Sequence, residues 1–212
     1  MNELPLKSKL SPMATLLEMP LKDAAPAVIQ EFKAKYPGAV LRIEAENSLH
    51  AGGMDEDQFW AIIDLLDWNQ PDRQSILAPA VEALSRFSKA DIQAFHDLMN
   101  EKLYALDGQR FAEELGSNKY LESEFFSVDD FLYSRCAVVA NGRAFFESVL
   151  KNPKRIPKEF TFEQLLYLPN KAWELKTGRD DYDYFPETWY ETFSNSEGWG
   201  GITPIKDRIL NA

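Results

Sequence analysis

The sequence has few of the residues on which covalent or metal-assisted chemistry depends. Among 212 residues there are one cysteine and two histidines. The lone Cys136 excludes an intramolecular disulfide and is interpreted as a small core residue, while His50 and His96 have no partner at metal-ligand spacing. There is also no glycine-rich phosphate loop, no GxSxG motif and no kinase signature. We therefore expect no metal site and no cofactor, and a function other than catalysis is favoured.

Positive charge is also scarce. Lys and Arg number 23 against 34 Asp and Glu, which gives a net charge of −11 with His neutral. This balance argues against binding to nucleic acid or to an anionic membrane, because both need a basic surface. No apolar run reaches the roughly 20 residues of a membrane span, and three prolines interrupt residues 1–20 where a signal peptide would lie. We expect a cytoplasmic protein whose unknown protein partner is, if charged, basic.

Apolar residues are abundant enough for a large core. Hydrophobic residues make up 45% of the chain and aromatic residues 13%. The fold class predicted is mainly α, with a multi-helix globular core domain over residues 54–178. Before the core we expect a loose leader (1–20) and a small helix-plus-strand unit (21–50), and after it an aromatic and acidic tail (179–212) that packs on the core. The lone strand, residues 39–45, needs a partner strand, which part of the leader, residues 201–205 or a second copy in a homodimer could supply.

Capping and stop signals set the expected helix ends. The central helix spans residues 127–142, with Ser127 as its N-cap and Asn141-Gly142 as its stop. Other helices are predicted over residues 23–36, 55–67, 75–87, 88–107, 110–115, 143–150 and 161–176. Pro79 fits its helix only if it lies in the first turn. Thr161 is expected to open the last helix in a capping box with Gln164.

Arg135 lies in the middle of the broad apolar face of the central helix. An ion cannot stay unpaired in a dry core, because its desolvation costs several kcal/mol. One interpretation is a buried ion pair with Asp107 or Glu174. The other is a site for a carboxylate or phosphate, with Arg135, Asp107, Tyr133 and Trp60 as the candidate ligand-binding residues. The aromatic tail also has two interpretations, a structural strap or a binding surface.

Four blocks of the sequence, taken in order, resemble a bacterial protein family. They are Asp57-Gln-Phe-Trp60, Glu101-Lys-Leu-Tyr-Ala-Leu-Asp-Gly108, residues 127–142 and residues 165–178. Together they are similar to the family called domain of unknown function 4240, over about residues 54–178. The resemblance implies a helical bacterial domain. It implies no activity and no catalytic residue.

Three classes of function compete. The acidic charge and the lack of a catalytic motif favour a protein-interaction or regulatory module, for example an immunity-type protein. The second class is a sensor of a small anionic ligand that uses Arg135, and the third is an enzyme with a carboxylate site that no motif identifies. An Arg135 that is fully enclosed and within salt-bridge distance of an acid would count against the sensor.

Overall fold

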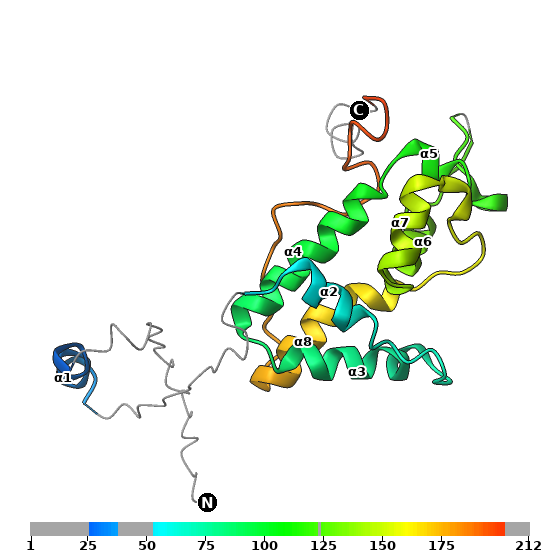
Figure 1. The fold of residues 1–212 in the computed structure, drawn as a ribbon. Helices are drawn as coiled ribbons and strands as arrows, with labels where there is room; N and C mark the ends of the chain where they lie inside the picture. Colours follow the sequence, from blue (N-terminus) through cyan, green and yellow to red (C-terminus); the bar gives the residue numbers. More distant parts are fainter. Residues whose placement is uncertain (1–25, 38–52, 123, 202–212) are drawn as a thin grey trace, which may run out of the picture. The chain divides into compact units, whose positions relative to one another are not determined.

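The computed structural model describes residues 26–37, 53–122 and 124–201, and the elements in these residues are helices (Figure 1). The predicted mainly helical fold is confirmed. The predicted strand 39–45 and the leader 1–20 lie outside the described residues, and the described part of the chain contains no strand. The chain divides into two units, residues 1–45 and residues 46–212. None of the described helices is both long and apolar enough to cross a membrane.

In the first unit the structure describes one helix, α1 (Pro26–Lys35). Pro26 occupies its first position, where a missing N–H costs no hydrogen bond. Lys33 and Lys35 lie in its last turn, where the helix dipole favours positive charge. The helix falls within the predicted span of 23–36 and is shorter than that span at both ends.

The second unit contains seven described α-helices and three short 3₁₀ helices. They are α2 (Glu56–Ile63), α3 (Arg73–Ser85), α4 (Lys89–Ala105), α5 (Gln109–Ala112), η2 (Gly116–Asn118), α6 (Val128–Ala140), α7 (Arg143–Lys151), η3 (Pro153–Arg155), η4 (Glu163–Tyr167) and α8 (Leu168–Thr177). Side-chain caps fix several starts, as predicted. Ser127 accepts a hydrogen bond from the N–H of Asp130 at 3.2 Å, and Asp55 and Ser88 each take part in a capping box.

Two predictions about proline and capping are wrong. Pro79 is inside α3, which begins at Arg73, and not in its first turn. The helix persists because Leu77, Ala80, Val81 and Leu84 bury its apolar side around the proline. The last helix does not open at Thr161. Instead residues Glu163–Tyr167 form a 3₁₀ turn and α8 starts at Leu168, which places Pro169 in the first turn, where its missing N–H costs no helical hydrogen bond.

The central helix α6 is enclosed by its neighbours. Nine of its thirteen residues are buried, and they include Ser134 and Ala137 on the side that the sequence indicates as polar. Cys136 is fully buried, and burial raises the pKa of its thiol to about 12. This is the environment expected of a core cysteine. Gly142 ends the helix with a φ of +84°, a left-handed conformation that favours glycine, and it also begins α7.

After α8 the chain runs along α4 as a segment of residues 180–199, here called the strap, which is mainly extended up to residue 190 and then forms turns (Figure 1). Hydrogen bonds join it to α4 at successive turns: Tyr184 donates to the Asp97 carboxylate, Asn100 donates to the Thr188 carbonyl at 2.8 Å, and Asn195 donates to the Tyr104 carbonyl at 3.2 Å. From residue 181 to 190 exposed and half-buried residues alternate. The strap therefore has the two-residue period of a strand without a strand partner.

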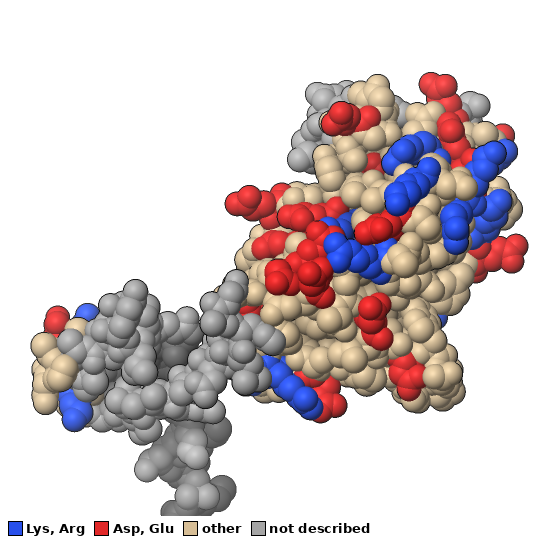
Figure 2. Space-filling view, in the orientation of Figure 1, with Lys and Arg blue, Asp and Glu red and all other residues tan. Residues whose placement is uncertain are grey.

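The described surface separates the two signs of charge. On the face shown in Figure 2, acidic side chains gather over α2 and α4, and most basic ones lie nearer α5 and α7, with some acidic side chains among them. Several of the basic residues are paired, and Arg143 is the most connected, with Asp57 at 2.6 Å, Glu147 at 3.3 Å and Glu56 at 3.8 Å. The region around α4 is thus the more acidic part of this face.

Candidate functional site

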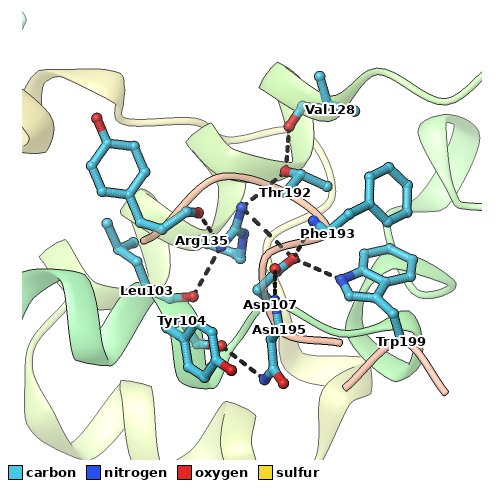
Figure 3. Close-up of polar contacts among 10 residues, drawn as sticks. Leu103, Tyr104, Asp107, Val128, Arg135, Thr192, Phe193, Asn195 and Trp199 are labelled. Atoms are coloured by element: carbon cyan, nitrogen blue, oxygen red, sulfur yellow. Dashed lines mark hydrogen bonds and ion pairs between the residues drawn. The ribbon is translucent and has the colours of Figure 1, made fainter. Parts of the chain in front are cut away.

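Arg135 is fully buried and donates three hydrogen bonds to protein groups (Figure 3). Its Nη1 donates to the carbonyl of Leu103 at 3.0 Å and to the carbonyl of Tyr190 at 2.9 Å, while Nη2 donates to Oγ1 of Thr192 at 2.9 Å. The guanidinium also lies over the Phe131 ring, 4.7 Å from its centroid. Arg135 therefore links three parts of the chain, namely α6, the end of α4 and the strap.

Asp107 is the carboxylate beside Arg135, with Oδ1 4.0 Å from Nη2, and it is also fully buried. It accepts hydrogen bonds from the backbone N–H of Phe193 at 3.2 Å, from the backbone N–H of Asn195 at 2.9 Å and from the indole N–H of Trp199 at 2.8 Å (Figure 3). All three donors belong to the strap. The carboxylate thus fixes the last third of the strap as well as balancing a buried charge.

The enclosure of Arg135 bears on the two interpretations of its role. Burial lowers the pKa of its guanidinium, and the neighbouring Asp107 acts in the opposite direction. Of the two carboxylates predicted as partners, Asp107 and Glu174, the former lies within salt-bridge distance. An anionic ligand could reach Arg135 only if the strap moved away. Arg135 is thus fully enclosed and within salt-bridge distance of an acid, which counts against the anion sensor.

Of the four candidate ligand-binding residues, the structure brings together Arg135 and Asp107. Trp60 lies on α2, where its indole N–H donates to Glu56 at 3.1 Å and its ring packs 5.3 Å from that of Phe146. Tyr133 is half-buried on α6, and its backbone carbonyl accepts a hydrogen bond from Phe162. Both residues support the helix packing in other places.

A hollow of about 450 Å³ opens where the strap crosses α4, and we call it the strap pocket. It is lined by Glu101 and Tyr104 of α4 and by Glu187, Thr188, Trp189 and Ser194 of the strap. Both walls are held in place by the bonds of Asn100 to Thr188 and of Asn195 to Tyr104. The network around Asp107 anchors the same stretch of strap, so the pocket depends on residues outside its lining.

The lining of the strap pocket combines two carboxylates with two aromatic rings and contains no basic residue. In the described parts of the chain, neither Glu101 nor Glu187 has an ion-pair partner, and both are exposed. Aromatic ring faces carry negative electrostatic potential and attract cations. Carboxylates and ring faces at one place therefore favour an organic cation.

Asn100 adds a buried acceptor beside this pocket. The residue is 3% exposed, and its Oδ1 is a buried atom without a hydrogen-bond partner in the structure. Its Nδ2 donates to the carbonyl of Thr188, a lining residue, so the amide lies at the pocket wall. Its Oδ1 has no exposed surface, so Asn100 supports the wall from behind and is not itself part of the lining.

A second hollow of about 330 Å³ differs from the strap pocket because a lysine lines it. It is lined by Gln109, Glu113, Lys119, Tyr120, Leu121 and Glu122. Here Lys119 places a cation of the protein itself among the carboxylates. The strap pocket has an acidic lining without such a cation. In the described residues, no group of three or more His, Cys, Asp or Glu is arranged to hold a metal ion.

A family model described as "Protein of unknown function (DUF4240)" matches residues 54–175. These are more than half of the 212 residues. The chain belongs to the DUF4240 family. No curated protein and no solved structure matches it. The family resemblance predicted from the four sequence blocks is thus confirmed.

The DUF4240 match divides the strap pocket between two parts of the chain. It covers α4, which supplies Glu101 and Tyr104, and it ends within α8, before the strap that supplies Glu187 and Trp189. Sequence reasoning missed these four residues as a group. Two signals were present, the aromatic character of the tail and the block of residues 101–108, but nothing in a sequence indicates that residues some 85 positions apart share a pocket.

Proposed function

We propose that this DUF4240 protein is a protein-interaction module that receives a basic segment of a partner protein in the strap pocket. The observation that carries the proposal is the pocket lining, in which Glu101, Glu187, Tyr104 and Trp189 meet without a basic residue. Such a module would act on its partner by occupying a basic surface, which is the mode of a regulatory or immunity-type protein.

The charge of the whole chain supports the same class of partner. A net charge of −11 attracts basic proteins over a distance and raises their rate of association, while the local pocket would select the group that docks. Trp189 is 65% exposed, which is unusual for so large an apolar side chain and typical of residues that become buried in an interface.

The two other classes of function receive less support. A sensor that holds an anion with Arg135 needs access to a side chain that is fully buried and bonded to Leu103, Tyr190 and Thr192. An enzyme with a carboxylate site needs acids whose environment shifts their pKa values in a cleft. Both acids of the strap pocket are exposed and not enclosed in a cleft. We therefore propose the interaction module alone.

Selection of peptides from a random 12-residue display library by the full-length protein tests this proposal. The wild-type protein, a Glu101→Gln/Glu187→Gln variant and a Glu113→Gln/Glu122→Gln variant are immobilised in parallel. The last variant removes the same charge from the second hollow and is the matched control. We expect the wild type and the control to enrich peptides rich in Lys and Arg, and the strap-pocket variant to lose this enrichment.

The two variants should differ from the wild type in binding and not in stability. All four substituted residues are exposed, so thermal unfolding of both variants is expected to match the wild type, with changes within about 0.5 kcal/mol. If the wild type enriches no basic peptides, the module does not recognise a basic segment. If the strap-pocket variant enriches the same basic peptides as the control, recognition lies elsewhere on the protein.

A further inference from the structure

We infer that the group received by the strap pocket is the guanidinium of an arginine side chain, an inference that rests on the proposed function. Lysine and arginine both carry a positive charge, but they differ in shape and in hydration. The guanidinium is planar, weakly hydrated and carries five N–H donors, whereas the ammonium is compact, strongly hydrated and carries three. The strap pocket offers features that suit the planar group.

The first feature is the pair of aromatic rings. Tyr104 comes from α4 and Trp189 from the strap, so the two rings belong to different walls of the pocket. Within the described chain neither ring is paired with another aromatic ring, unlike the nearby cluster of Phe193 and Trp199, whose ring centroids lie 4.3 Å apart. A guanidinium can stack on a free ring face and keep its N–H groups directed outward in its plane.

The second feature is the set of acceptors around the rings. Glu101 and Glu187 supply carboxylate oxygens from the two walls. A donor that satisfied both carboxylates would need N–H groups that point in different directions from one centre. The five donors of a guanidinium fork meet this need better than the three of an ammonium.

The third feature is that the chain's own cations near the pocket are already engaged. Lys102 follows Glu101 in the sequence, but its ammonium pairs with Glu56 at 3.0 Å on another side of α4. Arg135 is enclosed in the network behind the strap. Its setting, a ring face with carbonyl and carboxylate oxygens around the guanidinium, shows that this fold can accommodate an arginine in such surroundings.

Nuclear magnetic resonance titration of the full-length, ¹⁵N-labelled protein tests the inference with three small probes. They are the N-acetyl methylamides of arginine, lysine and citrulline, the last being neutral and similar to arginine in shape. We expect saturable shifts of the Trp189 indole N–H and the Asn100 side-chain amide with arginine. Lysine is expected to bind about 3-fold to 5-fold more weakly, since an exposed ring contributes that much to guanidinium stacking. Citrulline should give no saturable shift.

Variants make the result specific to the pocket. Glu101→Gln/Glu187→Gln should abolish saturable binding of both cations, and Glu113→Gln/Glu122→Gln should leave it unchanged. Trp189→Ala should remove the preference for arginine over lysine. Spectra of each variant outside the pocket report whether the fold is intact.

The binding results distinguish failure of the guanidinium inference from failure of the proposed function. Lysine that binds as tightly as arginine, or more tightly, overturns the guanidinium inference and leaves the basic-partner proposal standing. A preference for arginine that survives Trp189→Ala also overturns the stacking argument. No saturable binding of either cation, or citrulline that binds like arginine, overturns both.

Discussion

Asp107→Asn is the substitution that most directly tests the buried network. The change keeps the shape of the side chain but removes the negative charge that lies 4.0 Å from the Arg135 guanidinium. It also replaces one acceptor oxygen with an N–H₂ group, although every partner of Asp107 in the strap is itself a donor: Phe193, Asn195 and Trp199. The variant therefore leaves a buried cation without its counter-charge and brings two donors together.

The magnitude follows from these losses. Breaking a buried ion pair by removing one partner costs about 3–5 kcal/mol, and each hydrogen bond to a charged acceptor contributes roughly 1.5–3 kcal/mol. Since the two effects overlap, we expect the free energy of unfolding to fall by about 3–5 kcal/mol. With a urea dependence of roughly 2 kcal/mol per molar, the midpoint of unfolding should fall by about 1.5–2.5 M.

The assay is urea unfolding followed by far-ultraviolet circular dichroism, with Asp180→Asn as the control. Asp180 lies at the start of the strap and is exposed, so its substitution should change the free energy of unfolding by no more than about 0.5 kcal/mol. Hydrogen exchange of the Phe193 and Asn195 amides should accelerate in Asp107→Asn and not in the control. A loss below about 1 kcal/mol, with unchanged exchange at these amides, would refute the reasoning that the carboxylate anchors the strap.

Three further predictions concern stability. Burial lowers the pKa of His96 from 6.5 to about 4. Because the unfolded chain binds this proton more readily than the folded one, the free energy of unfolding should decline as the pH falls from 6.5 to 4. Urea midpoints measured over this pH range should decline less in His96→Gln than in the wild type. A Cβ on Gly198 would lie 2.5 Å from the backbone oxygen of Asp107, so Gly198→Ala should lower the free energy of unfolding by about 1–3 kcal/mol, and a variant as stable as wild type would contradict this close crossing. Trp199→Ala should lower the free energy of unfolding by about 3–5 kcal/mol because the ring is fully buried. Trp189→Ala should change it by no more than about 0.5 kcal/mol. Equal losses in the two variants would contradict the assignment of Trp199 to the core and Trp189 to the pocket.

The sequence is most informative where the signals are local. Ser127 as an N-cap and the stop at Gly142 follow from preferences that act within one turn, and the structure confirms them. Where tertiary packing overrides a local rule, the prediction fails. Pro79 lies inside α3 because the burial of that helix outweighs the missing backbone hydrogen bond.

The site was less predictable than the helices. The position of Arg135 on the apolar face of its helix predicted either a buried ion pair or an anion site, and Asp107 was one of two acids named as a partner in the first case. The course of the strap could not be predicted, because an extended segment without a strand partner has no hydrogen-bond ladder that fixes its position. Half-buried and exposed residues alternate from 181 to 190 in the structure. Such a two-residue pattern shows which residues share a face, but it does not show which helix that face packs against.

The Arg135–Asp107 pair and the strap pocket are parts of one arrangement. An extended segment that lacks a strand partner leaves its backbone groups in need of hydrogen bonds. Arg135 satisfies the carbonyl of Tyr190, and Asp107 satisfies the N–H groups of Phe193 and Asn195. The pair thus bonds the backbone of the strap where its extended part passes into turns: Arg135 donates to a carbonyl, and Asp107 accepts from N–H groups.

This arrangement explains why ionic residues occupy a place where apolar ones are often as stable. Apolar side chains would bury the same volume, but they could not bond the backbone of residues 190–195. The pocket residues lie on both sides of that stretch, with Glu187 and Trp189 before it and Ser194 within it. Loss of the buried pair should therefore release both the strap and the pocket that it forms, while loss of Glu187 removes only an exposed charge. If the strap pocket binds a cation as proposed, loss of the network should weaken that binding, and a bound cation should in turn stabilise the folded chain.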